Sequence, residues 1–130
     1  MSQEIIILLA VLLLFFTLTG IQVLLKMKSN GLATALGPRD SIPFPPPGIE
    51  GRIHRAIDNL RESLHFFTPL ILLTAILGIS NEATVLGAQI YLVARIFHAP
   101  LYLWGIPGLR TAAYGLGTVG MLVIAWGLLN

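Results

Sequence analysis

The chain has 130 residues, of which 55% are hydrophobic and 11% are charged, and its formal net charge is +2. A soluble domain is roughly 45 to 50% apolar and about 25% charged, so this chain cannot cover itself with a polar surface. It has no cysteine, which excludes disulfides and thiolate metal sites. Its eight Lys and Arg residues are spread along hydrophobic sequence, so we expect no nucleic acid partner. The three histidines are too widely spaced to predict a metal site.

The apolar runs predict an all-α fold: a single domain over residues 1–130, built as an integral membrane four-helix bundle. Residues 5–25 carry no charge and match the roughly 20 residues that cross a bilayer as a helix. A signal peptide is the competing interpretation, but Glu4 stands where a basic region would be expected, and the run is too long. The remaining spans are expected at about 62–80, 83–106 and 109–129.

The second span continues a helical pattern that begins near Arg52, so we expect one long helix with a polar first part. The first connection, about 26–51, contains the proline-rich segment 41–48, which favours a stiff extended connector over a ligand motif for a partner. In the fourth span, small residues predict close approach of neighbouring helices. These residues are Gly115, Gly117 and Gly120.

The cations indicate the orientation, because short cytoplasmic loops collect Lys and Arg. Six follow the first span, and Arg110 lies between spans three and four. The opposite side, with both termini and the 81–82 turn, has none. We therefore expect loops one and three to face the cytoplasm and both termini to face away from it. The six cations are Lys26, Lys28, Arg39, Arg52, Arg55 and Arg61.

Polar residues recur at helical spacing on three of the predicted helices, which places each set on one helix face. Together these groups describe a pocket for a small flexible anion that also carries an amino group: guanidinium for carboxylates, Glu for an ammonium group, and phenols for polar edges. The three sets are Arg52, Arg55, Asn59 and Glu62; Tyr91, Arg95, His98 and Tyr102; and Arg110, Thr111 and Tyr114.

Each of these residues also has a structural interpretation. Arg95, an arginine within a span, must face the bundle interior, where it could pair with Glu62 or another buried carboxylate or belong to a functional site. Arg52 and Lys26 could contact lipid headgroups from helix ends. His98 could be a hydrogen-bonded core residue. The tyrosines and tryptophans could form interfacial aromatic belts.

The segments 51–62, 91–102 and 109–114 resemble the MAPEG family, the membrane-associated proteins in eicosanoid and glutathione metabolism. The pattern Arg-x-x-Arg-Ala-x-x-Asn-x-x-Glu is followed by Arg-x-x-His-x-x-x-Tyr in a four-span chain of matching size, and the resemblance covers essentially the full length. Residues 37–40, Gly-Pro-Arg-Asp, resemble an element of the bacterial branch.

The resemblance implies a homotrimer of four-helix subunits that binds glutathione between adjacent subunits near the cytoplasmic face, as the co-substrate of a reaction with a lipophilic small molecule or lipid. It implies that Arg110 stabilises the thiolate, with a possible contribution from Thr111. The residues that it implies for binding glutathione or lining its site are Arg55, Asn59, Glu62, Tyr91, His98, Tyr102 and Arg110. To the binding residues we add Lys26 and Tyr114, and we expect Arg52 and Arg95 to be structural ion pairs or site residues.

The chain departs from the family pattern at some positions. Asp58 stands where several glutathione-using members carry a basic or amide residue, and it is expected to repel a glutathione carboxylate. Leu24 stands where some members place Arg, and the proline of helix two is displaced to Pro69. Our leading hypothesis is a glutathione-dependent membrane transferase or peroxidase, and the alternative is a non-catalytic binding or scaffold protein of the same fold. A four-span transporter is disfavoured because spans one and four contain no carboxylate for proton coupling.

Overall fold

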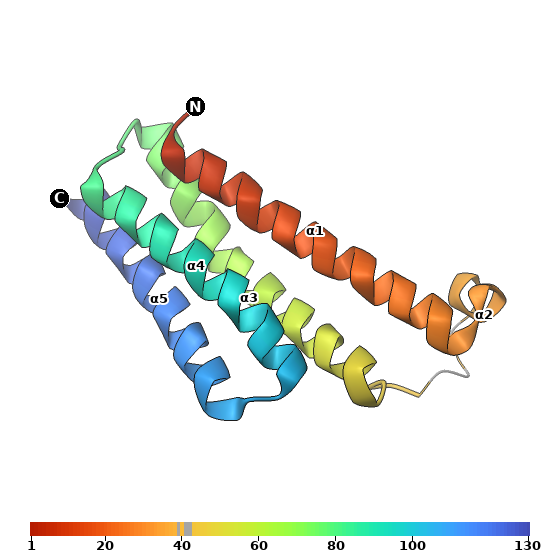
Figure 1. Cartoon of the computed structure of the whole chain (residues 1–130). Coiled ribbons are helices and arrows are strands. Elements are labelled where there is room, and N and C mark those ends of the chain that lie inside the picture. Colours follow the sequence, from red (N-terminus) through yellow and green to blue (C-terminus); the bar gives the residue numbers. More distant parts are fainter. Residues whose placement is uncertain (39, 41–42) are drawn as a thin grey trace.

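The computed structural model of the protein describes residues 1–38, 40 and 43–130. These residues form helices and no strand, and four of the helices are long and apolar enough to cross a membrane, which confirms the predicted all-α membrane bundle. Figure 1 shows the four long helices side by side, with a short helix beyond the first. The helices are α1 (Gln3–Asn30), α2 (Leu32–Leu36), α3 (Gly48–Leu77), α4 (Glu82–Trp104) and α5 (Pro107–Leu129).

The first connection contains more helix than its composition suggested. Helix α1 continues past the apolar run to Asn30, because Lys and Met favour helix, and it ends at Gly31 with φ 77°. Helix α2 adds another short helical stretch. The non-helical connection is therefore shorter than the predicted 26–51 loop. Arg39, Ser41 and Ile42, which belong to the predicted cation count and connector, lie outside the described residues.

Helix α3 joins a polar first part and an apolar second part in one continuous element of 30 residues. It begins at Gly48, directly after the proline run and ahead of the expected start near Arg52. Pro69 lies inside it and removes one backbone donor. The helix ends at Gly78, whose φ of 66° is in the left-handed region that glycine adopts without steric cost.

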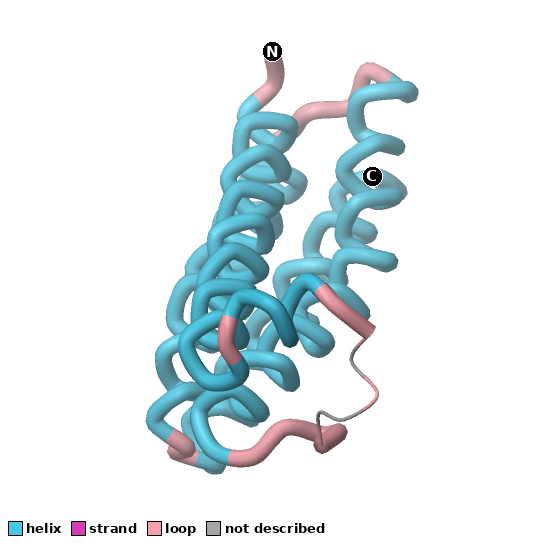
Figure 2. Tube along the Cα trace, turned by 90° about the vertical axis from the view of Figure 1, so that its right-hand side faces the viewer, coloured by secondary structure: helices cyan, strands magenta, loops and turns pink. Residues whose placement is uncertain are grey.

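Both chain termini lie at the same end of the bundle as the α3–α4 turn, and the α4–α5 turn lies at the other end with α2 (Figure 1). Figure 2 shows from a second side that the long helices run along a common direction. The predicted cytoplasmic connections therefore share one end of the molecule. Which end faces the cytoplasm stays a prediction from the distribution of Lys and Arg.

Helices α4 and α5 pack most closely, and glycines make this contact possible. A Cβ atom on Gly120 would lie 2.6 Å from the carbonyl oxygen of Gly87, and a Cβ on Gly87 would lie 2.6 Å from the carbonyl oxygen of Gly120. The predicted role of Gly120 in close helix packing is confirmed. Gly115, in contrast, has open space around its missing Cβ.

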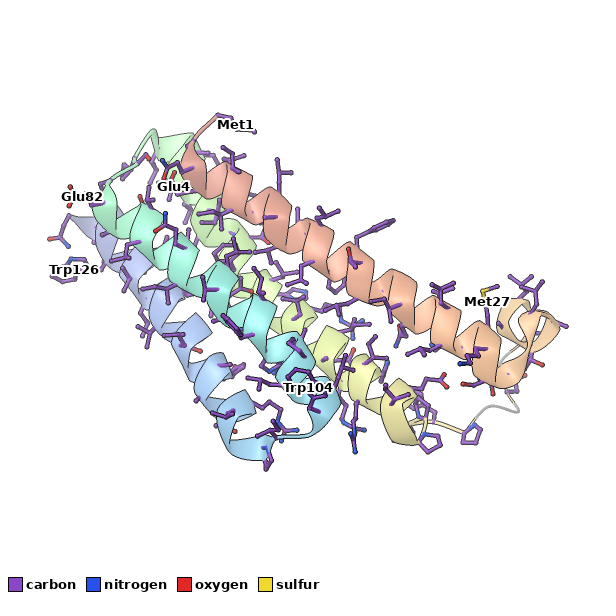
Figure 3. All side chains as sticks on the ribbon, in the orientation of Figure 1. Met1, Glu4, Met27, Glu82, Trp104 and Trp126 are labelled. Carbon is purple, nitrogen blue, oxygen red and sulfur yellow. The ribbon has the colours of Figure 1, made fainter. Side chains whose placement is uncertain are left out.

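The outward surface is that of a protein surrounded by lipid. Large apolar side chains such as Phe16, Phe66 and Leu122 are exposed along the helices. Trp104 and Trp126 are exposed near opposite ends of the bundle (Figure 3), at the two positions where interfacial tryptophans anchor a membrane protein. The arrangement supports an integral membrane protein that crosses the bilayer several times.

At the end that holds the termini, a buried carboxylate joins α1 to the α3–α4 turn. Glu4 is 0% exposed; its Oε1 accepts hydrogen bonds from Thr84 Oγ1 (2.6 Å) and Ser80 Oγ (2.9 Å), and Ser80 also reaches Oε2 (3.1 Å). Figure 3 shows Glu4 beside this turn. Residues 5–25 contain no carboxylate, but α1 begins at Gln3 and buries Glu4, so the first membrane helix does carry one near its start.

Candidate functional site

A cavity of about 220 Å³ opens between α3, α4 and α5. Five of its lining residues are members of the predicted site, and the sixth, Thr111, was predicted to assist Arg110. The folded chain therefore brings together polar residues from three helices that sequence spacing could only place on separate faces. The lining residues are Asn59, His98, Tyr102, Arg110, Thr111 and Tyr114.

Local helix geometry places the α4 and α5 contributions. His98 and Tyr102 are one turn apart, and their rings lie 5.4 Å apart between centroids. Helix α5 starts at Pro107, whose fixed φ suits the first helical position, so Arg110 and Tyr114 follow one turn apart on the same face. Because α5 follows α4 after a short turn, both faces line one cavity.

The cavity lining is rich in hydrogen-bond donors and contains no carboxylate. The Cζ atom of Arg110 lies 4.6 Å from the centre of the Tyr102 ring, a cation–π contact that fixes the guanidinium without using its N–H groups. Arg110 also lies near the start of α5, where the helix dipole is positive. The cavity is therefore suited to an anion.

A second arginine lies directly behind the cavity. Arg95 is 2% exposed, and its Nη1 donates to Oδ1 of Asn59 at 3.1 Å. Glu62, one of the partners considered for it, does not pair with it: in the described part of the chain, the carboxylate contacts of this kind join Asp58 to Arg61 and to the His54 ring. The buried arginine is held by an amide, which sequence reasoning did not foresee.

Two other predicted residues have structural contacts away from the cavity. Tyr91 is 0% exposed, stacks on Phe67 with 3.7 Å between ring centres, and shares a 2.7 Å hydrogen bond with Ser63 Oγ. In this chain Tyr91 is a core residue. Arg52 donates from Nη1 to the carbonyl oxygen of Leu103 at 3.0 Å, so it binds the negative end of the α4 dipole.

The remaining predicted residues are outside the cavity lining. Arg55 and Glu62 are exposed, and Lys26 is half-buried. Within the described residues, neither Arg55 nor Glu62 makes a side-chain hydrogen bond or an ion pair. They lie on the surface of a single chain.

Asp58, expected to repel a carboxylate at the site, instead lies in a separate polar network. It pairs with Arg61 and with Nε2 of His54 (3.2 Å), and Nδ1 of His54 is 3.0 Å from Nε2 of Gln22 on α1. Phe44 meets the His54 ring edge-on, with 5.2 Å between centres. Since the Arg61 guanidinium already compensates the Asp58 carboxylate, Asp58 belongs to a polar network at the α1–α3 contact and does not line the cavity.

Sequence reasoning missed one residue at the site. Gly117 supports Arg95, because a Cβ there would lie 3.1 Å from Nη2. The spacing from Arg110 through Tyr114 to Gly117 is four and three residues, the periodicity of one helix face, and this signal was available. The contacts of Ser63 and His54 had no such signal, because each joins helices far apart in sequence.

Of the comparisons with known proteins, one identifies a family. The model of the MAPEG family matches residues 4–130, nearly the whole chain. Comparison with curated proteins and with solved structures gives no significant match. The cavity and the four membrane-length helices thus occur in a chain that the family model covers from the first helix to the last. The protein belongs to the MAPEG family, the membrane-associated proteins in eicosanoid and glutathione metabolism.

Proposed function

We propose that the protein is a glutathione-dependent membrane transferase or peroxidase that acts on lipophilic electrophiles through a stabilised thiolate. The observation that carries the proposal is the donor-rich, carboxylate-free cavity with Arg110 in its wall. Membership of a family associated with glutathione supports the choice of ligand.

Arg110 is the residue best placed to stabilise a thiolate. A free thiol has a pKa near 8.5, and an adjacent guanidinium favours the anion, so bound glutathione ionises more readily at neutral pH. The start of α5 adds a positive dipole. Thr111 is less suited to donate, because its hydroxyl already donates to the carbonyl oxygen of Pro107 at 3.1 Å. We therefore assign the catalytic role to Arg110 and a minor role to Thr111.

Transfer needs only the thiolate, its electrophile and a proton from water, whereas reduction of a hydroperoxide also needs a second glutathione. In transfer, the sulfur electron pair forms a bond to an electrophilic carbon, and the electrons displaced in the acceptor take up a proton. With a lipid hydroperoxide, sulfur attacks the outer oxygen, the O–O bond breaks, and the leaving alkoxide takes up a proton to become an alcohol. A second glutathione then reduces the sulfenic acid to give the disulfide and water.

The proposal includes assembly into a homotrimer, because the cavity of one chain is small. Its 220 Å³ is below the roughly 300–1,000 Å³ of typical ligand pockets, so a neighbouring copy would cover and enlarge it. In a ring each interface joins two different faces of identical copies, so the face of the neighbouring copy can add residues to the cavity. Arg55, Glu62 and Lys26 are predicted to bind glutathione in that completed site.

The test is a titration of the purified protein in detergent with glutathione, followed by thiolate absorbance. We expect saturable thiolate formation, and Arg110→Ala should raise the pKa of the bound thiol by about one unit, which is a roughly tenfold loss of thiolate well below that pKa. Arg61→Ala is the matched control, since Arg61 is paired with Asp58 outside the cavity. No binding at millimolar glutathione would favour the non-catalytic scaffold.

A further inference from the structure

The guanidinium of Arg95 carries donors that nothing in the described chain uses. One nitrogen, Nη1, bonds to Asn59, while Nε and Nη2 are buried and have no hydrogen-bond partner. The described residues offer no ion pair to this arginine. A buried, uncompensated charge costs several kcal/mol, so a partner for it is expected from outside this chain.

Packing fixes the position of this guanidinium. Its Cζ lies 5.0 Å from the ring centre of Tyr91 and 5.4 Å from that of Tyr114. Gly117 leaves room for it, since a Cβ there would meet Nη2 at 3.1 Å and Nε at 3.4 Å. Ring contacts stabilise the cation but leave its N–H groups free. The arginine is therefore held in place independently of any ligand.

The fixed guanidinium decides which way the Asn59 amide is turned. Arginine has only donors, so the amide atom facing it must be the oxygen. Asn59 also lines the cavity, and in the described chain its Nδ2 bonds to no other residue. With one lone pair of its oxygen engaged by Arg95, Asn59 has mainly its two N–H donors to offer a ligand.

We propose that Arg95 is the positioning residue that makes this cavity select an anionic, acceptor-rich ligand. It turns the oxygen of Asn59 toward itself, leaves the amide N–H groups for the ligand, and adds a positive charge that the ligand neutralises. A carboxylate or carbonyl oxygen, and not an ammonium group, then lies opposite Asn59. The identification of that ligand group as part of glutathione rests on the proposed function.

Asn59→Asp is the decisive variant, because it nearly preserves shape. The aspartate keeps an oxygen for Arg95 and neutralises it, but it removes both N–H donors. We expect an unchanged or higher unfolding temperature together with at least about tenfold weaker glutathione binding, the loss expected for a hydrogen bond to a charged group. The apparent pKa of the bound thiol should rise, which a purely structural role would not produce.

Variants of Arg95 provide the complementary comparison. Arg95→Gln should weaken binding and raise the thiol pKa, and Arg95→Lys should restore part of both effects because it keeps the charge. Arg61→Gln is the matched control: Arg61 pairs with Asp58 outside the cavity, so glutathione affinity should not change. Equal affinity of wild type and Arg95→Gln would overturn the proposal.

Two small thiols of opposite charge separate this inference from the proposed function. Mercaptoacetate carries a carboxylate and cysteamine carries an ammonium group, and both are small thiols. The wild type should prefer mercaptoacetate, and Asn59→Asp should abolish or reverse that preference, even if glutathione itself does not bind. No preference in the wild type, or a lower unfolding temperature for Asn59→Asp, would contradict the role given to Arg95.

Discussion

The two ends of the bundle each bury a charge and treat it in opposite ways. At the closed end, defined by Glu4, Ser80, Thr84 and Gly127, both carboxylate oxygens of Glu4 accept hydrogen bonds from hydroxyl groups. At the cavity end, defined by the six lining residues and Arg95, two buried guanidinium nitrogens have no partner. The hydrogen-bonded carboxylate of Glu4 joins helices, whereas the enclosed guanidinium of Arg95 can act on a ligand through its charge and through Asn59, which lines the cavity.

The atoms that surround the helix glycines also differ between the two ends. At the closed end, a Cβ on Gly127 would lie 2.9 Å from the backbone nitrogen of Thr84 and 2.9 Å from Oδ1 of Asn81. At the cavity end, the three atoms nearest to a Cβ on Gly117 all belong to the side chain of Arg95. Direct backbone contact leaves less room for adjustment than contact with a side chain, so we expect the closed end to be the more rigid one.

The largest effect should come from Glu4→Ala. It leaves the Ser80 and Thr84 hydroxyls without their charged acceptor, and we expect about 2–3 kcal/mol of lost stability by thermal unfolding in detergent, given typical hydrogen bonds to charged groups. Glutathione affinity should not change. The control is Glu82→Gln in the same turn, an exposed carboxylate that should cost under about 1 kcal/mol. Equal losses for the two variants would contradict a structural role for Glu4.

Gly127→Ala should follow, with about 1–3 kcal/mol of lost stability, the usual cost of overpacking a tight contact. The new methyl group would push α5 away from the start of α4, where Asn81 Nδ2 donates to the carbonyl oxygen of Gly127 at 2.7 Å. Gly115→Ala is the matched control on the same helix, because its Cβ would meet nothing within 4 Å. If both variants unfold alike, the α4–α5 contact is not as described.

Tyr102→Phe should have the smallest effect on stability and a measurable effect on binding. The Tyr102 hydroxyl makes no hydrogen bond within the described chain, and phenylalanine keeps the ring under Arg110, so the unfolding temperature should stay the same. Glutathione affinity should fall by about five- to tenfold, equivalent to one ligand hydrogen bond of about 1 kcal/mol. A drop in stability without a change in affinity would place Tyr102 among the structural residues.

The bundle was predictable because lipid imposes strict rules on sequence. Apolar runs of membrane length predicted the four helices, and the 3.6-residue period predicted that Arg110 and Tyr114 share a face. Helix ends were less predictable: α1 extends to Asn30 and α3 starts at Gly48, because hydropathy marks the lipid boundary and backbone hydrogen bonding continues beyond it.

The sequence predicted which residues line the candidate site, but it did not predict which of them contact each other. Spacing selected His98, Tyr102 and Arg110, all of which line the cavity. It also selected Tyr91, which the fold buries against Phe67, and it suggested a carboxylate partner for Arg95. A helical period shows which residues share a face, and it carries no information on which face of a neighbouring helix lies opposite.

By itself the sequence determined that this chain has four membrane-length helices, that their polar stripes are rich in guanidinium and phenol groups, and that it resembles the MAPEG family. Only the tertiary structure decided that Glu4 accepts hydrogen bonds from the hydroxyl groups of Ser80 and Thr84. It also decided that Arg95 bonds to Asn59 and that two of its guanidinium nitrogens have no partner among the described residues. The physical reason is that local periodicity follows from backbone geometry within one helix. The partner of a buried charge depends on how separate helices rotate and shift against each other.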